Sequence, residues 1–278
     1  MNKRIWLITG VSSGLGKSMA RTAIKNGDFV IGTFRSQKQV DSFNNAYSNQ
    51  GKGIKLDINN FRDIDKAIDD IKNEFGKIDV LVNNAGFGFI GAVEEASISE
   101  IRAVMETNFF GTLKLTQSVL PLMRKKKKGH IIQISSHGGV KAFPGFGIYN
   151  ASKFALEGFS EALAGEIEPL GIKMTIVEPG PFRTGFAGDK LIEAEKIIED
   201  YNQTAGSFRS KLKQANGMQE GDPQKAAKVI LDIVNGEIDT LRVPLGKVPL
   251  TTIKMKIDSL HSDLESNRKI AASTVFEN

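Results

Sequence analysis

The sequence predicts an α/β fold, a single domain built on a doubly wound parallel sheet with helices on both faces. Strand-length apolar runs alternate with helical patterns from Arg4 to about Val243, which is typical of parallel strands joined by right-handed crossovers. The chain has 278 residues, of which 40% are hydrophobic and 25% charged, as in ordinary globular domains. That length is ample for a substantial core.

The first strand is predicted at Arg4–Thr9, and a helical pattern runs from Gly16 to about Asn26. The turn between them has glycines at positions 10, 14 and 16, so backbone N–H groups and a helix N-terminus face any bound phosphate. A Walker loop is the alternative interpretation of Gly16–Lys17–Ser18, but it needs glycine where Val11 stands.

The remaining elements continue the alternation. Strands are predicted at Asp28–Arg35, Ile54–Ile58, Ile78–Val82, His130–Ser135, Ile172–Val177 and Thr240–Val243, and a long helical segment at about Ile98–Met123. Residues 182–221 are predicted to form a helical flap over the site, with a helix at Leu191–Ile198 and glycines as hinges. Another helix begins at Pro223, and residues 247–278 form a C-terminal extension.

The apolar residues of that extension recur at Ile253, Ile257, Leu260 and Leu264, which predicts an amphipathic helix. Because its polar face mixes both signs of charge, docking on its own domain is favoured over a membrane role.

Composition excludes several functions. There is no cysteine, so disulfides and thiolate zinc sites are absent, and the three histidines are too scattered to suggest a metal. The net charge of +5 is small, and we interpret Arg124–Lys128 as a solvated connection rather than a nucleic-acid or membrane patch. No apolar run approaches the ~18 to 20 residues that span a bilayer. With no signal-peptide pattern either, the sequence predicts a cytoplasmic protein with a small-molecule substrate.

The most informative stretch runs from Ser136 to Lys153. If a helix begins near Tyr149, its phenol and the Lys153 ammonium are four residues apart and share one helical face. Ser136 follows the strand 130–135 and can present its hydroxyl to the same place. A phenol has a pKa of about 10, and a nearby cation lowers it toward the range of a useful acid or base.

Five motifs occur in a fixed order along the chain: Thr-Gly-x-x-x-Gly-x-Gly from Thr9, Asn83–Asn84–Ala85–Gly86, Asn108, the set Ser136, Tyr149 and Lys153, and Pro179–Gly180. Together they resemble the short-chain dehydrogenase/reductase family, and the matches extend from Thr9 to about Thr184. The resemblance implies a Rossmann-type fold and hydride transfer between a nicotinamide and a carbonyl or alcohol carbon.

The resemblance also implies residue roles. Tyr149 is the general acid/base at the substrate oxygen, which Ser136 holds. Lys153 lowers the pKa of Tyr149 and binds the nicotinamide ribose, and Asn108 fixes a water that relays protons. The implied cofactor-binding residues are Gly10, Ser12, Ser13, Gly14, Leu15, Gly16, Arg35, Asp57, Ile58, Asn83, Ala85, Gly86, Tyr149, Lys153, Pro179, Gly180 and Thr184.

Cofactor choice depends on the end of the second strand. An acidic residue there would bind the adenosine ribose and repel a 2′-phosphate, whereas this chain has Phe34 and then Arg35. A guanidinium suits a phosphate dianion, so NADP(H) is preferred over NAD(H). NADP(H)-dependent relatives often have a basic residue where this chain has Ser13, which departs from that pattern.

Seven phenylalanines, Phe87, Phe89, Phe143, Phe146, Phe182, Phe186 and Phe208, are predicted to surround a roomy apolar pocket. The chain resembles 17β-hydroxysteroid and retinol-dehydrogenase-like members, which implies a bulky apolar substrate. A 3-oxoacyl-carrier-protein reductase and a non-catalytic redox sensor are the alternatives. Family members often pair through the helices that hold Asn108 and Tyr149, so a homo-oligomer is expected, although the C-terminal extension could obstruct one such contact.

Overall fold

The computed structural model describes residues 3–188 and 190–276. Asp189 of the predicted flap and the last two residues of the extension lie outside this part of the chain. Among the described residues, seven strands form one parallel sheet in the order β3-β2-β1-β4-β6-β7-β9. These strands are β1 Ile5–Ile8, β2 Phe29–Phe34, β3 Gly51–Lys55, β4 Val80–Asn83, β6 Gly129–Ile134, β7 Ile172–Pro179 and β9 Arg242–Leu245.

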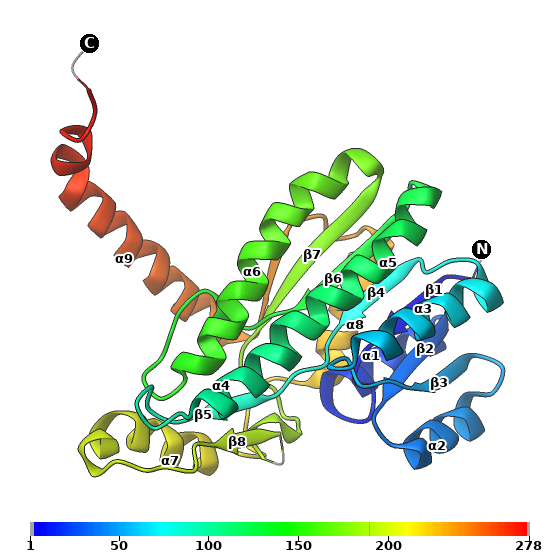
Figure 1. Cartoon of the computed structure of the whole chain (residues 1–278), viewed down its shortest axis with the longest axis horizontal. Coiled ribbons are helices and arrows are strands. Elements are labelled where there is room, and N and C mark those ends of the chain that lie inside the picture. Colours follow the sequence, from blue (N-terminus) through cyan, green and yellow to red (C-terminus); the bar gives the residue numbers. More distant parts are fainter. Residues whose placement is uncertain (1–2, 189, 277–278) are drawn as a thin grey trace.

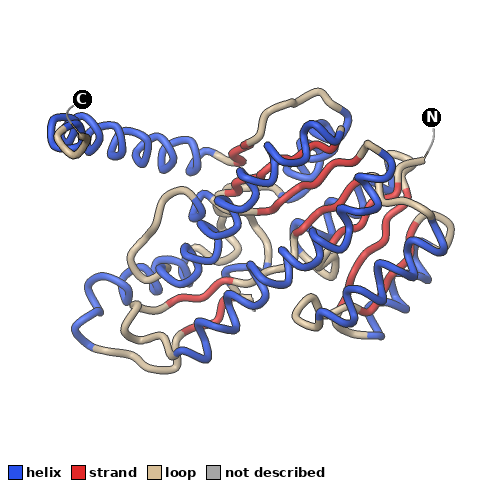
Figure 2. The backbone as a smooth tube through the Cα atoms, turned by 45° about the horizontal axis from the view of Figure 1, so that its top comes forward, coloured by secondary structure: helices blue, strands red, loops and turns tan. Residues whose placement is uncertain are grey.

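Helices cover both faces of this sheet (Figure 1, Figure 2). One core joins the sheet to α1 Gly14–Lys25, α2 Gln37–Tyr47 and α8 Pro223–Asn235. The other joins it to α3 Phe61–Phe75, α5 Thr112–Lys126 and α6 Gly147–Ile167. The predicted doubly wound α/β fold is confirmed, and it places the carboxyl ends of all these strands at one edge, where such sheets bind ligands.

The predicted helix at 98–123 consists of three consecutive segments. α4 Ile98–Met105 continues into a π-helical stretch, Glu106–Gly111, and then into α5. The wider turn contains Asn108, and π-helical turns occur frequently at functional sites. Gly111 is required here because a Cβ at that position would lie 2.6 Å from the Ile58 carbonyl oxygen.

The third strand was predicted three residues too late. β3 is Gly51–Lys55, so Asp57 and Ile58 follow the strand instead of ending it. Glycine is disfavoured in strands, but α2 packs directly on this one: a Cβ at Gly51 would lie 2.9 Å from the Phe43 ring. Close helix packing therefore overrides the intrinsic preference.

The predicted helix at Leu191–Ile198 is wrong. The segment begins as β8 Leu191–Glu193, which pairs in parallel with β5 Gly88–Ile90. Beyond it, the Ile198 N–H donates to the Glu95 carboxylate at 2.9 Å, so the backbone finds its partners outside a helix. The helix of the flap is α7 Ser207–Gln214, later in the chain.

The amphipathic C-terminal helix is confirmed as α9 Lys247–Ala272, but its docking on the domain is wrong. The helix projects away from the sheet (Figure 1), and Pro249 is its one buried residue. No helix in residues 3–188 and 190–276 has the length and apolar character needed to cross a membrane.

His130 gives the fold a pH dependence. Its Nε2 lies 2.9 Å from Thr175 Oγ1 in the core, and burial lowers its pKa from 6.5 to about 4. The folded state therefore disfavours the proton, so this contribution to stability is present above pH 6.5 and is lost as the pH falls toward 4. Across that window His130→Gln should differ from the wild type by up to about 3 kcal/mol in its pH-dependent unfolding free energy.

Urea titrations of both proteins at a series of pH values measure this difference. His261→Gln is the matched control, because His261 is exposed on α9. Parallel pH profiles for wild type and His130→Gln would contradict the assignment.

Candidate active site

The glycine turn after β1 fits a dinucleotide. Gly10 and Gly14 have φ values of +70° and +57°, which favour glycine. A Cβ on Gly16 would lie 2.5 Å from both the Gly10 carbonyl oxygen and Asn84 Nδ2. That amide donates to the Thr9 carbonyl at 2.8 Å and holds the turn against the next strand. The free backbone at the start of α1 is the kind of cradle that a pyrophosphate occupies.

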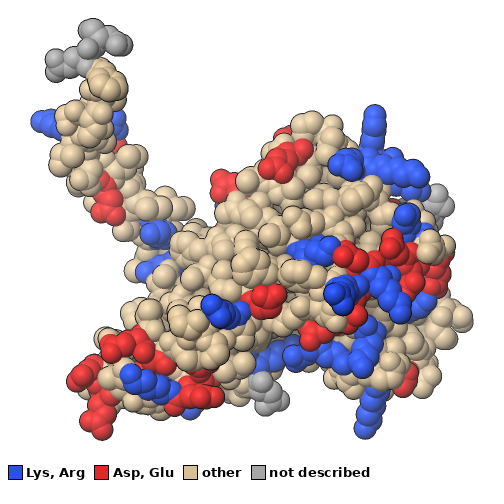
Figure 3. Space-filling view, viewed as in Figure 1, with Lys and Arg blue, Asp and Glu red and all other residues tan. Residues whose placement is uncertain are grey.

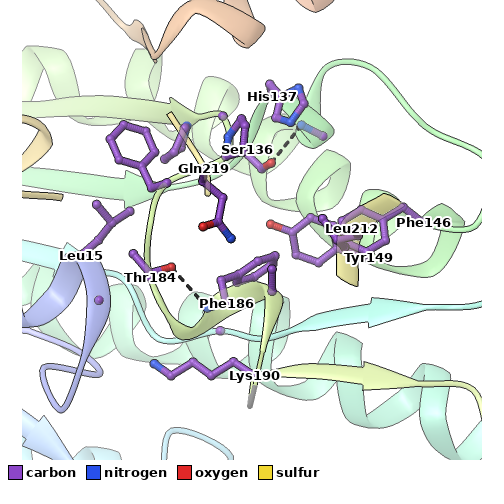
Figure 4. Close-up of a pocket in the computed structure, with 18 of the residues that line it drawn as sticks. Leu15, Ser136, His137, Phe146, Tyr149, Thr184, Phe186, Lys190, Leu212 and Gln219 are labelled. Carbon is purple, nitrogen blue, oxygen red and sulfur yellow. Dashed lines mark hydrogen bonds between the residues drawn. The ribbon is translucent and has the colours of Figure 1, made fainter. Parts of the chain in front are cut away.

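A cavity of about 420 Å³ extends from this turn to the start of α6, within the usual range for small-molecule sites. It brings together ten of the predicted site residues: Ser13, Gly14, Leu15, Gly86, Ser136, Tyr149, Lys153, Pro179, Gly180 and Thr184. Figure 4 shows the Tyr149 hydroxyl and Ser136 pointing into the same space, with Thr184 on the side nearer Leu15.

Ser136 and Tyr149 meet at the end of β6 and the start of α6. Ser136 Oγ accepts a hydrogen bond from the Gly138 N–H at 3.0 Å, which fixes its direction. Burial raises the pKa of Tyr149 from 10.0 to about 12, and a hydrogen bond with Ser136 opposes that rise. The phenol is thus held protonated at neutral pH, as a proton donor to a carbonyl oxygen must be.

Lys153 is buried beside this phenol. Its Nζ donates to the Ile134 carbonyl at 2.8 Å and lies 6.0 Å from the centre of the Tyr149 ring. Burial lowers the pKa of Lys153 from 10.5 to about 8, while the Glu157 carboxylate opposes the shift. The predicted lowering of the Tyr149 pKa by Lys153 does not appear in this structure, where burial of the phenol raises its pKa.

Asn108 lies behind the cavity. Its Oδ1 accepts from the Phe87 N–H at 3.1 Å, and its Nδ2 donates to the Phe87 carbonyl at 3.0 Å and to Ser152 Oγ at 3.1 Å. A Cβ on Gly86 would be 3.0 Å from Asn108 Oδ1 and 3.9 Å from Lys153 Nζ. Asn108 therefore fixes the floor of the site, next to the lysine.

Other predicted cofactor residues lie outside the cavity lining. Asn83 Nδ2 donates to Thr116 Oγ1 at 2.9 Å in the interior, which gives it a structural role. Asp57 lines a separate shallow surface hollow, and its Oδ1 accepts from the Asn59 N–H at 3.0 Å. Ile58 is buried and Arg35 is exposed at the end of β2.

Some of the cofactor-binding residues predicted in and beside the glycine turn also lie outside the cavity lining. Gly10, Ser12, Gly16 and Ala85 do not line the cavity.

Lys190 is a site residue that the sequence did not reveal. It lines the cavity from the flap, and its side chain runs past Phe186 toward the α1 side (Figure 4). Burial lowers the pKa of Lys190, and the charge of Arg35 lowers it further. Arg35, which lies outside the cavity lining, is thus close enough to Lys190 for their charges to interact, although the two residues are far apart in the sequence and no motif links them.

The apolar lining agrees with the sequence analysis for six of seven phenylalanines. Phe87, Phe143, Phe146, Phe182, Phe186 and Phe208 line the cavity, whereas Phe89 is buried in a separate core cluster. The first two turns of α9 also contribute, since Val248 and Thr252 line the cavity and Thr252 Oγ1 lies 3.1 Å from His137 Nδ1.

A parallel sheet, a glycine turn at a helix N-terminus and a phenol beside a buried lysine define a nucleotide-binding oxidoreductase. The short chain dehydrogenase family model matches residues 4–195, so the chain belongs to this family. The resemblance found in the sequence is thereby confirmed at the level of family and fold.

Individual relatives and solved structures support this assignment to the family. A 3-ketodihydrosphingosine reductase of Bacteroides thetaiotaomicron is 41% identical over 254 residues, covering 88% of this chain and 89% of the relative. A crystal structure of a short-chain dehydrogenase from Streptomyces avermitilis is 39% identical, with a TM-score of 0.92 over 99% of both chains. ElxO with NADP bound is 26% identical, with a TM-score of 0.74 over 90% of this chain and 99% of that one. Similar structures hold NAD or NADP.

Proposed function

We propose that this protein is an NADP(H)-dependent oxidoreductase that interconverts a carbonyl and an alcohol on a bulky apolar molecule. The observation that carries the proposal is the convergence of Ser136 and the protonated Tyr149 on one phenylalanine-lined cavity. A screen of aldehydes, ketones and quinones with NADPH and NADH side by side tests it through oxidation of the reduced cofactor.

The chain's own residues support a specific sequence of proton movements. Ser136 holds the substrate carbonyl oxygen, and Tyr149 donates its proton to that oxygen as the carbonyl carbon is reduced. When bound, the nicotinamide supplies the hydride. Lys153 sits where its ammonium stabilises the resulting phenolate, and Asn108 holds the backbone beside it. In the oxidative direction the same groups accept the proton.

The preference for NADP(H) rests on charge. Lys190 on the flap lines the cavity, and its charge interacts with that of Arg35 at the end of β2. We assign both to the 2′-phosphate side of the cofactor, where charge-assisted hydrogen bonds favour a phosphate over a hydroxyl.

Arg35→Ala should weaken NADPH binding by roughly tenfold to a hundredfold, the value of a hydrogen bond to a charged group, and should leave NADH binding nearly unchanged. Lys190→Ala should act in the same direction with a smaller effect. Titration of cofactor fluorescence measures both dissociation constants. Lys38→Ala, an exposed lysine of α2, is the control, and equal losses for NADPH and NADH would contradict the assignment to the 2′-phosphate.

The substrate class is inferred from the lining and from one relative. Six aromatic rings suit a large apolar group, and the Bacteroides relative is named for reduction of a keto group in 3-ketodihydrosphingosine. A steroid- or retinol-like molecule fits the same description. A 3-oxoacyl thioester on a carrier protein is the competitor, and including one in the screen separates the two.

The homo-oligomeric state, the cytoplasmic location and the absence of nucleic-acid partners stay predictions of the sequence. Sedimentation of the purified chain measures the first of these directly.

A further inference from the structure

α9 exposes apolar side chains along most of its length. Leu250, Ile257, Leu260 and Leu264 are 62%, 55%, 53% and 63% exposed. The helix has 26 residues and is therefore about 39 Å long. In Figure 3 it stands clear of the domain as an arm that carries charged side chains of both signs. Such a surface marks an interaction site, because most of the stability of an amphipathic helix in a protein comes from packing of its apolar face.

The N-terminal end of α9 is the part of the helix that packs on its own domain. A Cβ on Gly180 would lie 2.6 Å from Pro249 Cδ, and Thr252 meets His137. From Leu250 onward along the helix, apolar residues recur at 250, 253, 257, 260 and 264, in alternating steps of three and four. This is the spacing of the seam in a two-helix coiled coil, so the expected partner is another helix.

Charged side chains beside the seam indicate which helix is the partner. Lys254 pairs with Asp258, and Arg268 with Glu265, along α9 itself. Lys256 and Asp263, each three residues after a seam position, make no ion pair among the described residues. In an antiparallel pair, flanking positions of this kind face their equivalents on the partner helix. A second α9 with Ile257 opposite Leu260 therefore joins each Lys256 to the other chain's Asp263.

We propose that α9 pairs antiparallel with α9 of a second copy of this chain. The antiparallel direction places the two domains at opposite ends of the pair, where they do not collide. A lipid surface fits less well, because acidic side chains are interspersed with basic ones along the helix. The inference rests on the homo-oligomer proposed above and names its surface, and it does not depend on the oxidoreductase chemistry.

Charge exchange tests both partner and direction. Lys256→Glu alone and Asp263→Lys alone each create two like-charged contacts and should weaken association at least about tenfold. The double variant restores both contacts with the signs exchanged and should associate like the wild type. Leu260→Asp should halve the mass of the assembly, whereas Lys269→Glu, away from the seam, should leave that mass unchanged. Sedimentation velocity over a concentration series gives the masses, and circular dichroism with NADPH titration verifies that each domain is folded.

The absence of cysteine allows a second readout. Under oxidation, a mixture of Ile257→Cys and Leu260→Cys chains should form the mixed disulfide dimer in preference to either self-pair. Preferential self-pairing would overturn the antiparallel arrangement. A monomeric wild type would overturn both the homo-oligomer and this inference. An oligomer whose mass is unchanged by Leu260→Asp would overturn this inference alone.

Discussion

Tyr149→Phe is expected to lower turnover by about 10²- to 10⁴-fold, the usual contribution of a positioned general acid. The variant keeps the ring, which packs against Phe146 and Phe186 at centroid distances of 4.8 and 5.5 Å, so the fold and NADPH binding should be nearly unchanged. What is lost is the proton for the substrate oxygen. Tyr47→Phe, on α2 far from the cavity, is the control.

The protonation state of Tyr149 also predicts how the activity depends on pH. Since burial raises the pKa of Tyr149 to about 12, the phenol stays protonated at neutral pH, and carbonyl reduction should persist there without an alkaline limb from this group. A Tyr149→Phe variant with turnover within a few-fold of the wild type would assign the proton donor to another residue.

Arg242→Ala is expected to destabilise the fold by roughly 2 to 4 kcal/mol. Its guanidinium Nε lies 3.2 Å from Glu157 and 3.4 Å from Glu178, whose side chains are 7% and 2% exposed. Removing the cation leaves two buried carboxylates together, which costs about 3 to 5 kcal/mol for a fully buried pair. The expected loss is smaller because 35% of Arg242 reaches solvent.

The loss should depend on pH in a defined sense. Burial and Glu157 raise the pKa of Glu178 from 4.5 to about 7. A group whose pKa is raised in the folded state contributes stability at low pH and loses it as the pH rises through that value. Arg242→Ala should therefore be less destabilising at pH 5 than at pH 8. Glu161→Gln, at the exposed third partner, should change the unfolding free energy by less than about 1 kcal/mol.

Chemical denaturation at the two pH values measures these effects. An Arg242→Ala variant within about 1 kcal/mol of the wild type would show that Glu157 and Glu178 are accommodated without their cation.

The fold and the core of the site were predictable because they depend on local rules. Strand-length apolar runs fixed the sheet, and the spacing of Gly10, Gly14 and Gly16 follows from a backbone that has no room for a Cβ. Tyr149 and Lys153 share a face because they are four residues apart on α6. Ser136 reaches them because a strand ends just before it.

The parts that were missed depend on contacts distant in sequence. The flap segment 191–198 has helical periodicity, yet pairing with β5 and the carboxylate of Glu95 satisfy its backbone. Lys190 is a cavity residue only because that strand carries it there. The stripe on α9 showed an apolar face but not its partner, since a sequence pattern does not distinguish burial on one's own domain from burial on another chain.

Transfer of deuterium from the nicotinamide C4 position of labelled NADPH to a ketone tests whether this protein reduces a carbonyl with Tyr149 as the proton donor. For the wild type we expect an alcohol with deuterium on the former carbonyl carbon, and for Tyr149→Phe almost none under the same conditions. Tight NADPH binding by the wild type with no labelled product from any carbonyl in a broad panel would contradict it and favour a non-catalytic redox sensor.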